Sequence, residues 1–302
     1  MVNNLLSIHA KSFSWAGFFL PSDVYKNGSD LYDFCRILDD IADEEISLEI
    51  KKKKFLNYKN DFINHNFEND SIKKIHRIIK NFDVSEKIVL DLFDGIESDL
   101  KEKIEFKSKR ELLVYSYRVA GTVGLMMAKI LRVKSKTALK SAIDLGIAMQ
   151  LTNISRDVIE DRKKNREYIK HDLSNIKNTI TTADLFYNSC FNSIREIPIR
   201  CRFAILVARR VYREIGYKII KKRDIEEYNQ SGKIYVTKSG KIVQTILSIF
   251  DFFRLLFIQS DNYYRNEEHN EIGLEINIDE RIWLYNNWWR LRWPLLSLRA
   301  WN

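Results

Sequence analysis

Four polar side chains recur at helical spacing between residues 31 and 43. At about 100° per residue they fall within about 60° of one another on one helix face: Tyr32, Arg36, Asp39 and Asp43. Asp40 lies just beside this face. This first acidic stripe combines a phenol, a guanidinium and two carboxylates, which suits the binding of cations together with an anionic group.

A second polar stripe follows near the middle of the chain. Offsets of three, seven and eleven residues place four side chains on one face: Gln150, Asn153, Asp157 and Asp161. Apolar residues occupy another face of the same segment and can anchor it to a core: Leu151, Ile154 and Val158. This second acidic stripe is rich in hard oxygen atoms.

Carboxylates four residues apart on a helix repel each other unless a cation lies between them. Each stripe taken alone could be an ordinary solvated surface. Both stripes, however, mix carboxylates with amide, phenol or guanidinium groups inside otherwise apolar segments. Mg²⁺ typically takes one or two carboxylates and completes its shell with phosphate and water. Two facing stripes of this kind predict a magnesium-dependent site that stabilises a departing diphosphate.

The elements that must position these stripes are helices. The 302 residues contain only 3 prolines and 10 glycines, which favours long uninterrupted helices and an all-α domain. We expect the stripes on helices over residues 31–45 and 134–161, with further helices elsewhere at apolar spacing. Asn27 to Asp30 reads as a turn followed by a helix cap. The small residues of Gly121-Thr122-Val123-Gly124 predict a kink or a close helix approach within residues 109–131.

The net charge of +9 indicates an anionic partner, and the sequence has no recognisable nucleic-acid-binding motif. Its three cysteines lack metal-ligand spacing and suit a reducing compartment. The N-terminal residues do not read as a signal peptide, and residues 246–258 are too short and too charged for a membrane span. We therefore expect a cytoplasmic protein without an obligate protein partner, at most peripheral at the inner face of the membrane.

Five ordered motifs make the chain resemble the squalene/phytoene synthase family of head-to-head prenyl transferases. The resemblance covers roughly the first 240 residues, and the motifs are His9–Phe13, Leu31–Asp43, Tyr117–Gly124, Gly146–Asp161 and Asn165–Tyr168. It implies an all-α isoprenoid-synthase fold, with helices around a central hydrophobic cavity and the acidic stripes at its mouth.

The resemblance also implies a role for each matching position. Five residues would bind metal ions, Mg²⁺ or alternatively Mn²⁺: Asp39, Asp43, Asn153, Asp157 and Asp161. Diphosphate would contact Ser12, Tyr32, Arg36, Gln150 and Arg156. Tyr168 and Tyr212 would lie at the cavity mouth near the departing diphosphate. The hydrocarbon pocket would be lined by Val119, Val123 and Gly124, where the missing glycine side chain leaves room for a long chain.

Four positions depart from the family pattern. Ala10 replaces a common serine, and Asn165–Lys170 lacks both the glycine and the proline of the usual motif. Lys233 stands at a position where the family has arginine, which keeps the charge but loses bidentate phosphate binding. These changes concern substrate geometry rather than the class of chemistry.

The implied reaction joins two prenyl diphosphates through a cyclopropyl diphosphate intermediate. Geranylgeranyl diphosphate would give phytoene, for carotenoid biosynthesis, and we favour this reading. Farnesyl diphosphate would give dehydrosqualene, or squalene if NADPH supplies hydride. Two further alternatives are a class I terpene cyclase and a non-catalytic relative that serves in assembly or lipid binding; the retention of all four aspartates argues against the last.

We divide the chain into a catalytic domain over residues 1–270 and a C-terminal tail over residues 271–302. Five of the six tryptophans fall after residue 280 and alternate with arginines. Both residue types suit a membrane interface, whereas a segment packed on the helical core is the equal alternative. The sequence leaves the prenyl chain length and the oligomeric state open.

Overall fold

The computed structural model describes residues 11–258 and 265–283, with the side chains of residues 11–13 and 283 excepted. Within these ranges the chain is almost entirely helical. The elements, in chain order, are α2 (Lys11–Gly17), α3 (Ser22–Asp43), α4 (Leu48–Ile63), α5 (Asp70–Phe82), α6 (Glu86–Glu97), β1 (Ile104–Glu105), α7 (Lys109–Ser116), the π-helix η1 (Tyr117–Gly121), α8 (Thr122–Ile130), α9 (Lys136–Lys163), β2 (Arg166–Glu167), α10 (Leu173–Ser189), the 3₁₀-helix η2 (Asn192–Glu196), α11 (Ile199–Ile220), α12 (Ile225–Gln230), α13 (Lys238–Phe257), α14 (Glu267–Gly273) and α15 (Ile278–Trp283).

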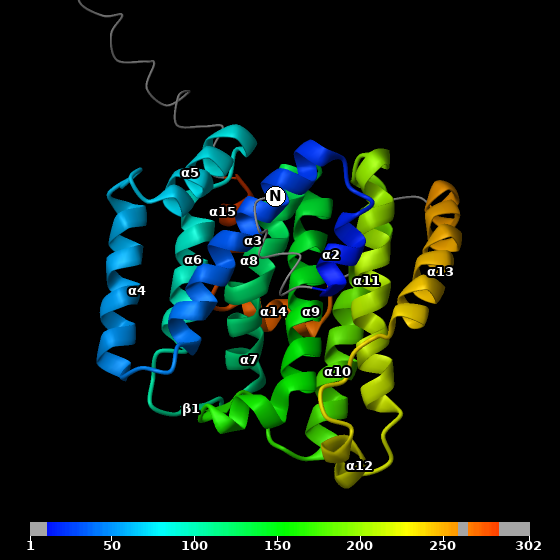
Figure 1. The fold of residues 1–302 in the computed structure, drawn as a ribbon. Coiled ribbons are helices and arrows are strands. Elements are labelled where there is room, and N and C mark those ends of the chain that lie inside the picture. The colour runs from blue at the N-terminus through cyan, green and yellow to red at the C-terminus, as the bar shows by residue number, and fades with distance from the viewer. Residues whose placement is uncertain (1–10, 259–264, 284–302) are drawn as a thin grey trace, which may run out of the picture.

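Helix α9 lies at the centre of the bundle and packs against η1, α8, α10 and α11. Figure 1 shows α4 and α13 at opposite edges, with the remaining helices arranged around α9. Several helices begin where a side chain accepts a hydrogen bond from a backbone N–H of the first turn, which satisfies a donor that the helix itself cannot pair: Ser85, Ser108, Ser135, Asp172, Asp224 and Thr237.

The predicted turn at residues 27–30 is wrong, because α3 runs through it without interruption. Gly28 faces Met127 on α8, where a Cβ would meet the methionine at 3.4 Å. Asp30 is buried and bonds Arg77 (Nη2–Oδ2, 2.5 Å) on α5. Contacts with neighbouring helices therefore override the local turn preference of this segment.

The predicted irregularity at residues 121–124 takes the form of a π-helix and a backbone-to-backbone contact with α9. A Cβ on Gly124 would lie 2.2 Å from the carbonyl oxygen of Ala142, and one on Gly146 would lie 2.2 Å from that of Ala120. The idea that Gly124 leaves room for a hydrocarbon is thus wrong, since α9 occupies that room. The two glycines instead let the central helices approach closely.

We expect Gly146→Ala to lower the free energy of unfolding by about 2–3 kcal/mol, because a rigid backbone carbonyl cannot move away as a side chain can. Urea unfolding measures the effect. Gly273→Ala is the matched control, since the nearest atom to its Cβ is Arg265 Nη2 at 3.7 Å. Equal stability of the two variants would contradict the close contact.

The predicted domain boundary at residue 270 falls inside α14, which contacts the helical body. His269 Nε2 lies 3.0 Å from Asp144 Oδ2 on α9, and Ser189 on α10 donates to the same oxygen at 2.7 Å. Arg281 on α15 forms two bonds to the buried Asp91 on α6, at 2.7 and 3.0 Å. Residues 284–302, with most of the tail tryptophans, lie outside the described residues, so the division and the role of the tail stay predictions.

Candidate active site

The first acidic stripe occupies the C-terminal half of α3. Asp39 is exposed to solvent, although neighbouring protein atoms crowd its carboxylate. This surrounding protein raises the pKa of Asp39 to about 7, and repulsion from Asp43 adds to the effect. Arg36 opposes both effects, and its Nη2 also pairs with Asp40 at 2.6 Å. The stripe therefore carries more negative charge than its own cation balances.

The second acidic stripe lies on α9, and its C-terminal end likewise carries an excess of negative charge. Burial raises the pKa of Asp161 to about 7, and repulsion from Asp157 contributes further. Asp157 itself is bonded by the neighbouring Arg156 (Nε–Oδ1, 2.8 Å) and approached by Lys233 (Nζ–Oδ1, 3.4 Å). Lys233 also bonds Glu160 at 2.7 Å, so the loop after α12 lies against α9.

The chain after α9 turns back and connects the two stripes. Lys164 Nζ lies 2.8 Å from Asp43 Oδ2, and Arg166 Nη1 lies 2.7 Å from Asp43 Oδ1. The parallel pairing of β2 with β1, with Arg166 opposite Ile104, holds this segment in place. Burial tends to raise the pKa of Asp43, but the two cations bring it below its ordinary value.

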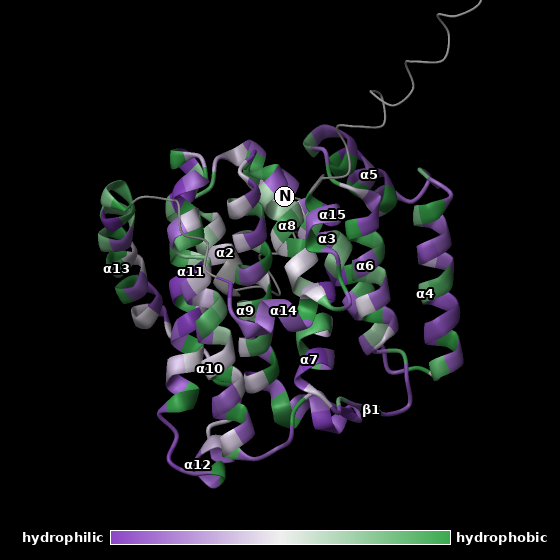
Figure 2. Ribbon diagram, turned by 180° about the vertical axis from the view of Figure 1, so that it is seen from behind, coloured by the Kyte–Doolittle hydropathy of each residue, from purple (hydrophilic) through white to green (hydrophobic). Residues whose placement is uncertain are grey.

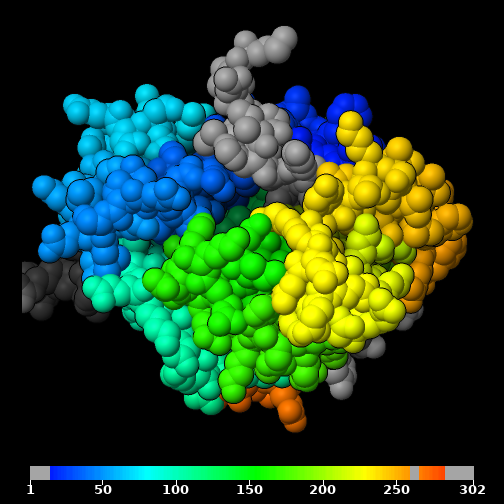
Figure 3. Space-filling model, turned by 60° about the horizontal axis from the view of Figure 1, so that its bottom comes forward, coloured from blue at the N-terminus to red at the C-terminus, as the bar shows by residue number. Residues whose placement is uncertain are grey.

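Tyr212 on α11 lies within electrostatic range of both stripes. Its side chain is buried, and burial raises its pKa to about 12, with influences from Arg156 on α9 and Tyr32 on α3. Both stripes therefore lie around the same space, as predicted. Figure 3 shows a surface recess where the α3–α4 region (blue), the α9–β2 region (green) and the segment after α12 (yellow) meet.

Asp99, which the sequence analysis did not identify, is the buried anion behind the stripes. It accepts hydrogen bonds from the hydroxyls of Tyr115 (2.8 Å) and Tyr168 (2.7 Å), whose rings stack at 4.8 Å. Burial raises its pKa, and Arg166 opposes this. Asp99 follows α6 without any helical spacing to mark it, whereas Arg166 belongs to the Asn165–Tyr168 motif and Lys164 directly precedes that motif.

Tyr168 is directed at Asp99 and is only 6% exposed, so it lies behind the recess rather than at an open mouth. Val119 and Val123 are half-buried on η1 and α8 and pack against the core. Gln150 is half-buried on α9 beside Asn153. Ser12 begins α2, but its side chain lies outside the described part of the structure.

The residues present fit divalent metal ions by two observations. The buried Asn153 Oδ1 has no hydrogen-bond partner among the described residues, although a buried amide oxygen normally has one. Asp39 and Asp161 both have pKa values raised to about 7, which a nearby cation would reverse. Within the described ranges, three carboxylates of the stripes do not converge on one point. That spread suits ions whose shells are completed by phosphate and water.

We expect the metal-free protein to lose stability as the pH rises from about 4 to about 7, between the unfolded and folded pKa values of two stripe aspartates. Asp39 and Asp161 have folded-state pKa values of about 7, above an unfolded value of about 4, so the folded state binds more protons up to that pH. Asp43, whose pKa is lowered, titrates below this window. Thermal unfolding with EDTA measures the loss, and added Mg²⁺ should reverse it at the higher pH. A metal-free midpoint that rises with pH would contradict this expectation.

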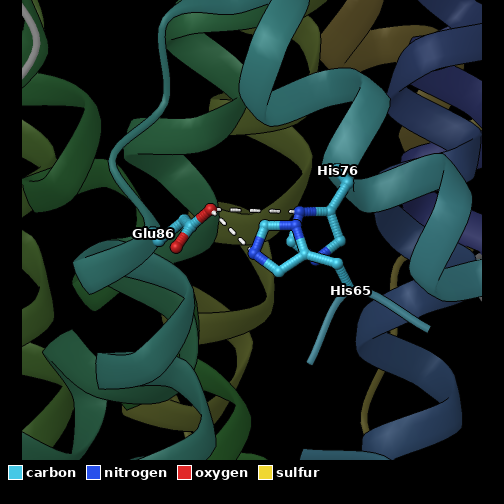
Figure 4. Close-up of side chains that lie close together, drawn as sticks. All are labelled: His65, His76 and Glu86. Carbon is cyan, nitrogen blue, oxygen red and sulfur yellow. Dashed lines mark ion pairs between the residues drawn. The ribbon is translucent and has the colours of Figure 1, made fainter. Parts of the chain in front are cut away.

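A separate cluster of His65, His76 and Glu86 lies near α5 (Figure 4). Glu86 Oε1 is 3.9 Å from His65 Nε2 and 4.0 Å from His76 Nδ1. The two imidazole rings stack at 4.3 Å, and Phe62 stacks on His76 at 4.8 Å. Ring packing accounts for this arrangement. Because its ligand atoms could also bind added metal, His65→Ala is the necessary control in any metal titration of the acidic stripes.

The all-α bundle with two facing acidic helices defines the class as an isoprenoid-synthase-type enzyme. The family model for squalene/phytoene synthase matches residues 6–175, so the chain belongs to the squalene/phytoene synthase family and is an enzyme of the prenyl transferase type. The predicted family and fold are thereby confirmed.

Curated relatives and solved structures agree with this assignment. The chain is 28% identical over 262 residues to the 15-cis-phytoene synthase of Paracoccus sp., covering 77% of this chain and 84% of the relative. It is 28% identical over 265 residues to the phytoene synthase of Rhodobacter capsulatus, covering 79% and 77%. The fold matches a crystal structure of a dehydrosqualene synthase in complex with ligand at a TM-score of 0.68 and 24% identity, covering 83% of this chain and 94% of that chain.

Proposed function

We propose that this enzyme condenses two molecules of geranylgeranyl diphosphate head-to-head into phytoene. The observation that carries the proposal is the convergence of the two acidic stripes, joined by Lys164 and Arg166, in a chain whose curated bacterial relatives are phytoene synthases. The first condensation releases one diphosphate and one proton and gives a cyclopropyl diphosphate. Ionisation of that intermediate releases the second diphosphate, and rearrangement with loss of a proton gives phytoene.

We assign Mg²⁺ to the two stripes, with Asp39, Asp43, Asn153, Asp157 and Asp161 as its protein ligands. When bound, Mg²⁺ would stabilise the negative charge that develops on the leaving diphosphate. The set is suited to this because its carboxylates exceed their own cations and Asn153 Oδ1 is buried without a partner among the described residues.

Basic and phenolic side chains around the recess would orient the diphosphates. Arg36 pairs with Asp40 beside the first stripe, and Arg156 and Lys233 pair with Asp157 of the second stripe. Each can exchange that partner for a phosphate oxygen as metal neutralises the aspartates. Tyr32, Tyr212, Gln150 and Ser12 are assigned to the same task. Tyr168 acts from behind, as a positioning residue that holds Asp99.

Apolar side chains of η1 and α8 would receive the hydrocarbon. Val119 and Val123 are the two we assign, since both keep some exposure although neighbouring helices surround them. Such side chains would bind a prenyl chain by burial, with each buried methylene contributing about 0.8 kcal/mol, so methylenes that a pocket cannot enclose would lose this contribution. Pocket depth thus controls the choice between substrates.

A product assay tests the proposal. Purified protein is incubated with Mg²⁺ and either geranylgeranyl or farnesyl diphosphate, with and without NADPH, and the hydrocarbons are identified by mass spectrometry. Phytoene from the longer substrate, independent of NADPH, is the expected result. A cyclic product would move the chain to the terpene cyclases, and a folded sample without product would favour the non-catalytic relative.

Dehydrosqualene formation from farnesyl diphosphate is the second candidate. It is favoured by the likeness in fold to a dehydrosqualene synthase. The two candidates share the leaving group and the acidic stripes, and they differ in the chain length that the pocket accepts. Higher kcat/KM for farnesyl diphosphate in the same assay would select this candidate, and squalene formed only with NADPH would select a squalene synthase.

A further inference from the structure

Helix α13 turns a hydrophobic face outward. We define its outer face by the exposed apolar residues Ile242, Val243, Ile246, Ile249, Phe250, Phe253, Leu256 and Phe257. Among them, Phe250 is 67% exposed and Phe257 is 87% exposed. A surface helix of a globular protein normally has the opposite arrangement, with its apolar stripe against the core. Figure 2 shows the hydrophobic colouring of α13 at the edge of the molecule.

The inner face of α13 buries Leu255 and packs Phe252 against Phe203, and polar contacts add to this apolar packing. Asp251 is buried and accepts two bonds from Arg210 on α11, at 2.5 and 2.9 Å. Gln244 donates to Glu214 on the same neighbouring helix at 3.0 Å. Trp15 on α2 donates to Thr245 Oγ1 at 3.0 Å. These directional bonds fix the rotation of the helix, so the outward placement of its apolar face is a built feature of the fold.

Charges along α13 indicate which kind of partner covers this face. Lys238 and Lys241 lie at its beginning and Arg254 near its end, whereas its one acidic residue, Asp251, is buried and paired. Self-association through two copies of α13 would bring cations near cations or apolar residues, with no exposed carboxylate on the helix to pair them. An anionic lipid surface complements both the apolar face and its flanking cations.

We propose that α13 is a bilayer-docking helix that lies in the headgroup region of anionic phospholipid membranes through its outer face. It would lie along the surface, since among the described residues no helix has the length and apolarity to cross a bilayer. Phe250, Phe253 and Phe257 would enter the acyl boundary, and the flanking cations would contact lipid phosphate. This docking is independent of the reaction that the acidic stripes perform.

Vesicle flotation of the full chain tests the proposal. The probes are vesicles of phosphatidylcholine alone and vesicles that also contain phosphatidylglycerol. We expect the wild type to float with the anionic vesicles, and Phe250→Ser/Phe253→Ser/Phe257→Ser to reduce the bound fraction at least about tenfold, since three large apolar side chains no longer leave water on docking. Lys238→Glu/Lys241→Glu should weaken binding to the anionic vesicles in a salt-dependent way.

The matched control is Leu56→Ser, which removes another exposed apolar side chain (56% exposed) from α4 at the opposite edge of the molecule. Circular dichroism checks that every variant stays folded. Undiminished flotation of the triple variant would overturn the proposal, and so would loss of flotation only when residues 284–302 are removed. It would also be overturned if the wild type did not bind vesicles and was a dimer by light scattering, while the triple variant was a monomer.

Discussion

Replacing Asp39 or Asp157 by asparagine is expected to reduce product formation by a factor of about 10³ or more. Each change removes one carboxylate that we assign to metal binding, one from each acidic stripe. Asparagine keeps the size and shape of the side chain, so the helical fold should survive. Steady-state product formation at saturating Mg²⁺ measures the effect, with circular dichroism as the check of folding.

Asp39→Asn should also stabilise the metal-free protein above about pH 7, which a general structural defect would not do. Asp39 has a raised pKa because protein surrounds it and Asp43 repels it, so its charge costs folding free energy without metal. The thermal midpoint with EDTA at about pH 8 reports this directly. Asp23→Asn, in the first turn of the same helix, is the control and should change neither activity nor midpoint appreciably. Retained activity in both stripe variants would refute the assignment of metal ligands.

Arg166→Gln is expected to have the second largest effect, on stability and activity together. Arg166 bonds Asp43 (2.7 Å) and the carbonyl oxygen of Ala42 (3.2 Å), and it opposes the charge of Asp99. Its loss leaves several partly buried carboxylates without their main cation. We expect the free energy of unfolding in EDTA to fall by about 3 kcal/mol. Chemical denaturation measures it, and saturating Mg²⁺ should restore part of the loss.

Lys164→Gln is the matched control for that prediction. Lys164 bonds the same carboxylate at 2.8 Å, but its side chain is 46% exposed whereas that of Arg166 is 11% exposed. Exposed ion pairs contribute only about 0.2–1 kcal/mol, so this variant should lose little stability. If both variants lost the same small amount, Arg166 would not be the cation that joins the stripes.

The stripes were predictable because they depend on local geometry. Once a segment is helical, a residue three, four or seven positions away must share its face, so Asp39 with Asp43 and Asn153 with Asp157 follow from spacing alone. The all-α class followed in the same way from scarce proline and glycine. The family motifs then related the two stripes to each other, which periodicity by itself does not do.

Features that depend on packing between helices were missed or misread. Asn27 to Asp30 has the composition of a turn, yet burial of Asp30 and its bond with Arg77 keep it helical. Gly124 was assigned to a pocket, whereas it adjoins the backbone of α9. In each case the local sequence permits two structural roles, and residues far along the chain decide between them.

Sequence alone thus determined the helical class, the two acidic stripes and the family. Tertiary structure decided that Lys164 and Arg166 bridge the stripes at Asp43, that Tyr115 and Tyr168 hold Asp99 behind them, and that α13 presents its apolar face outward. The physical reason is the separation along the sequence over which each property is decided. Helical periodicity is a property of neighbours a few residues apart, whereas desolvation, ion pairing and exposure depend on which distant segments meet.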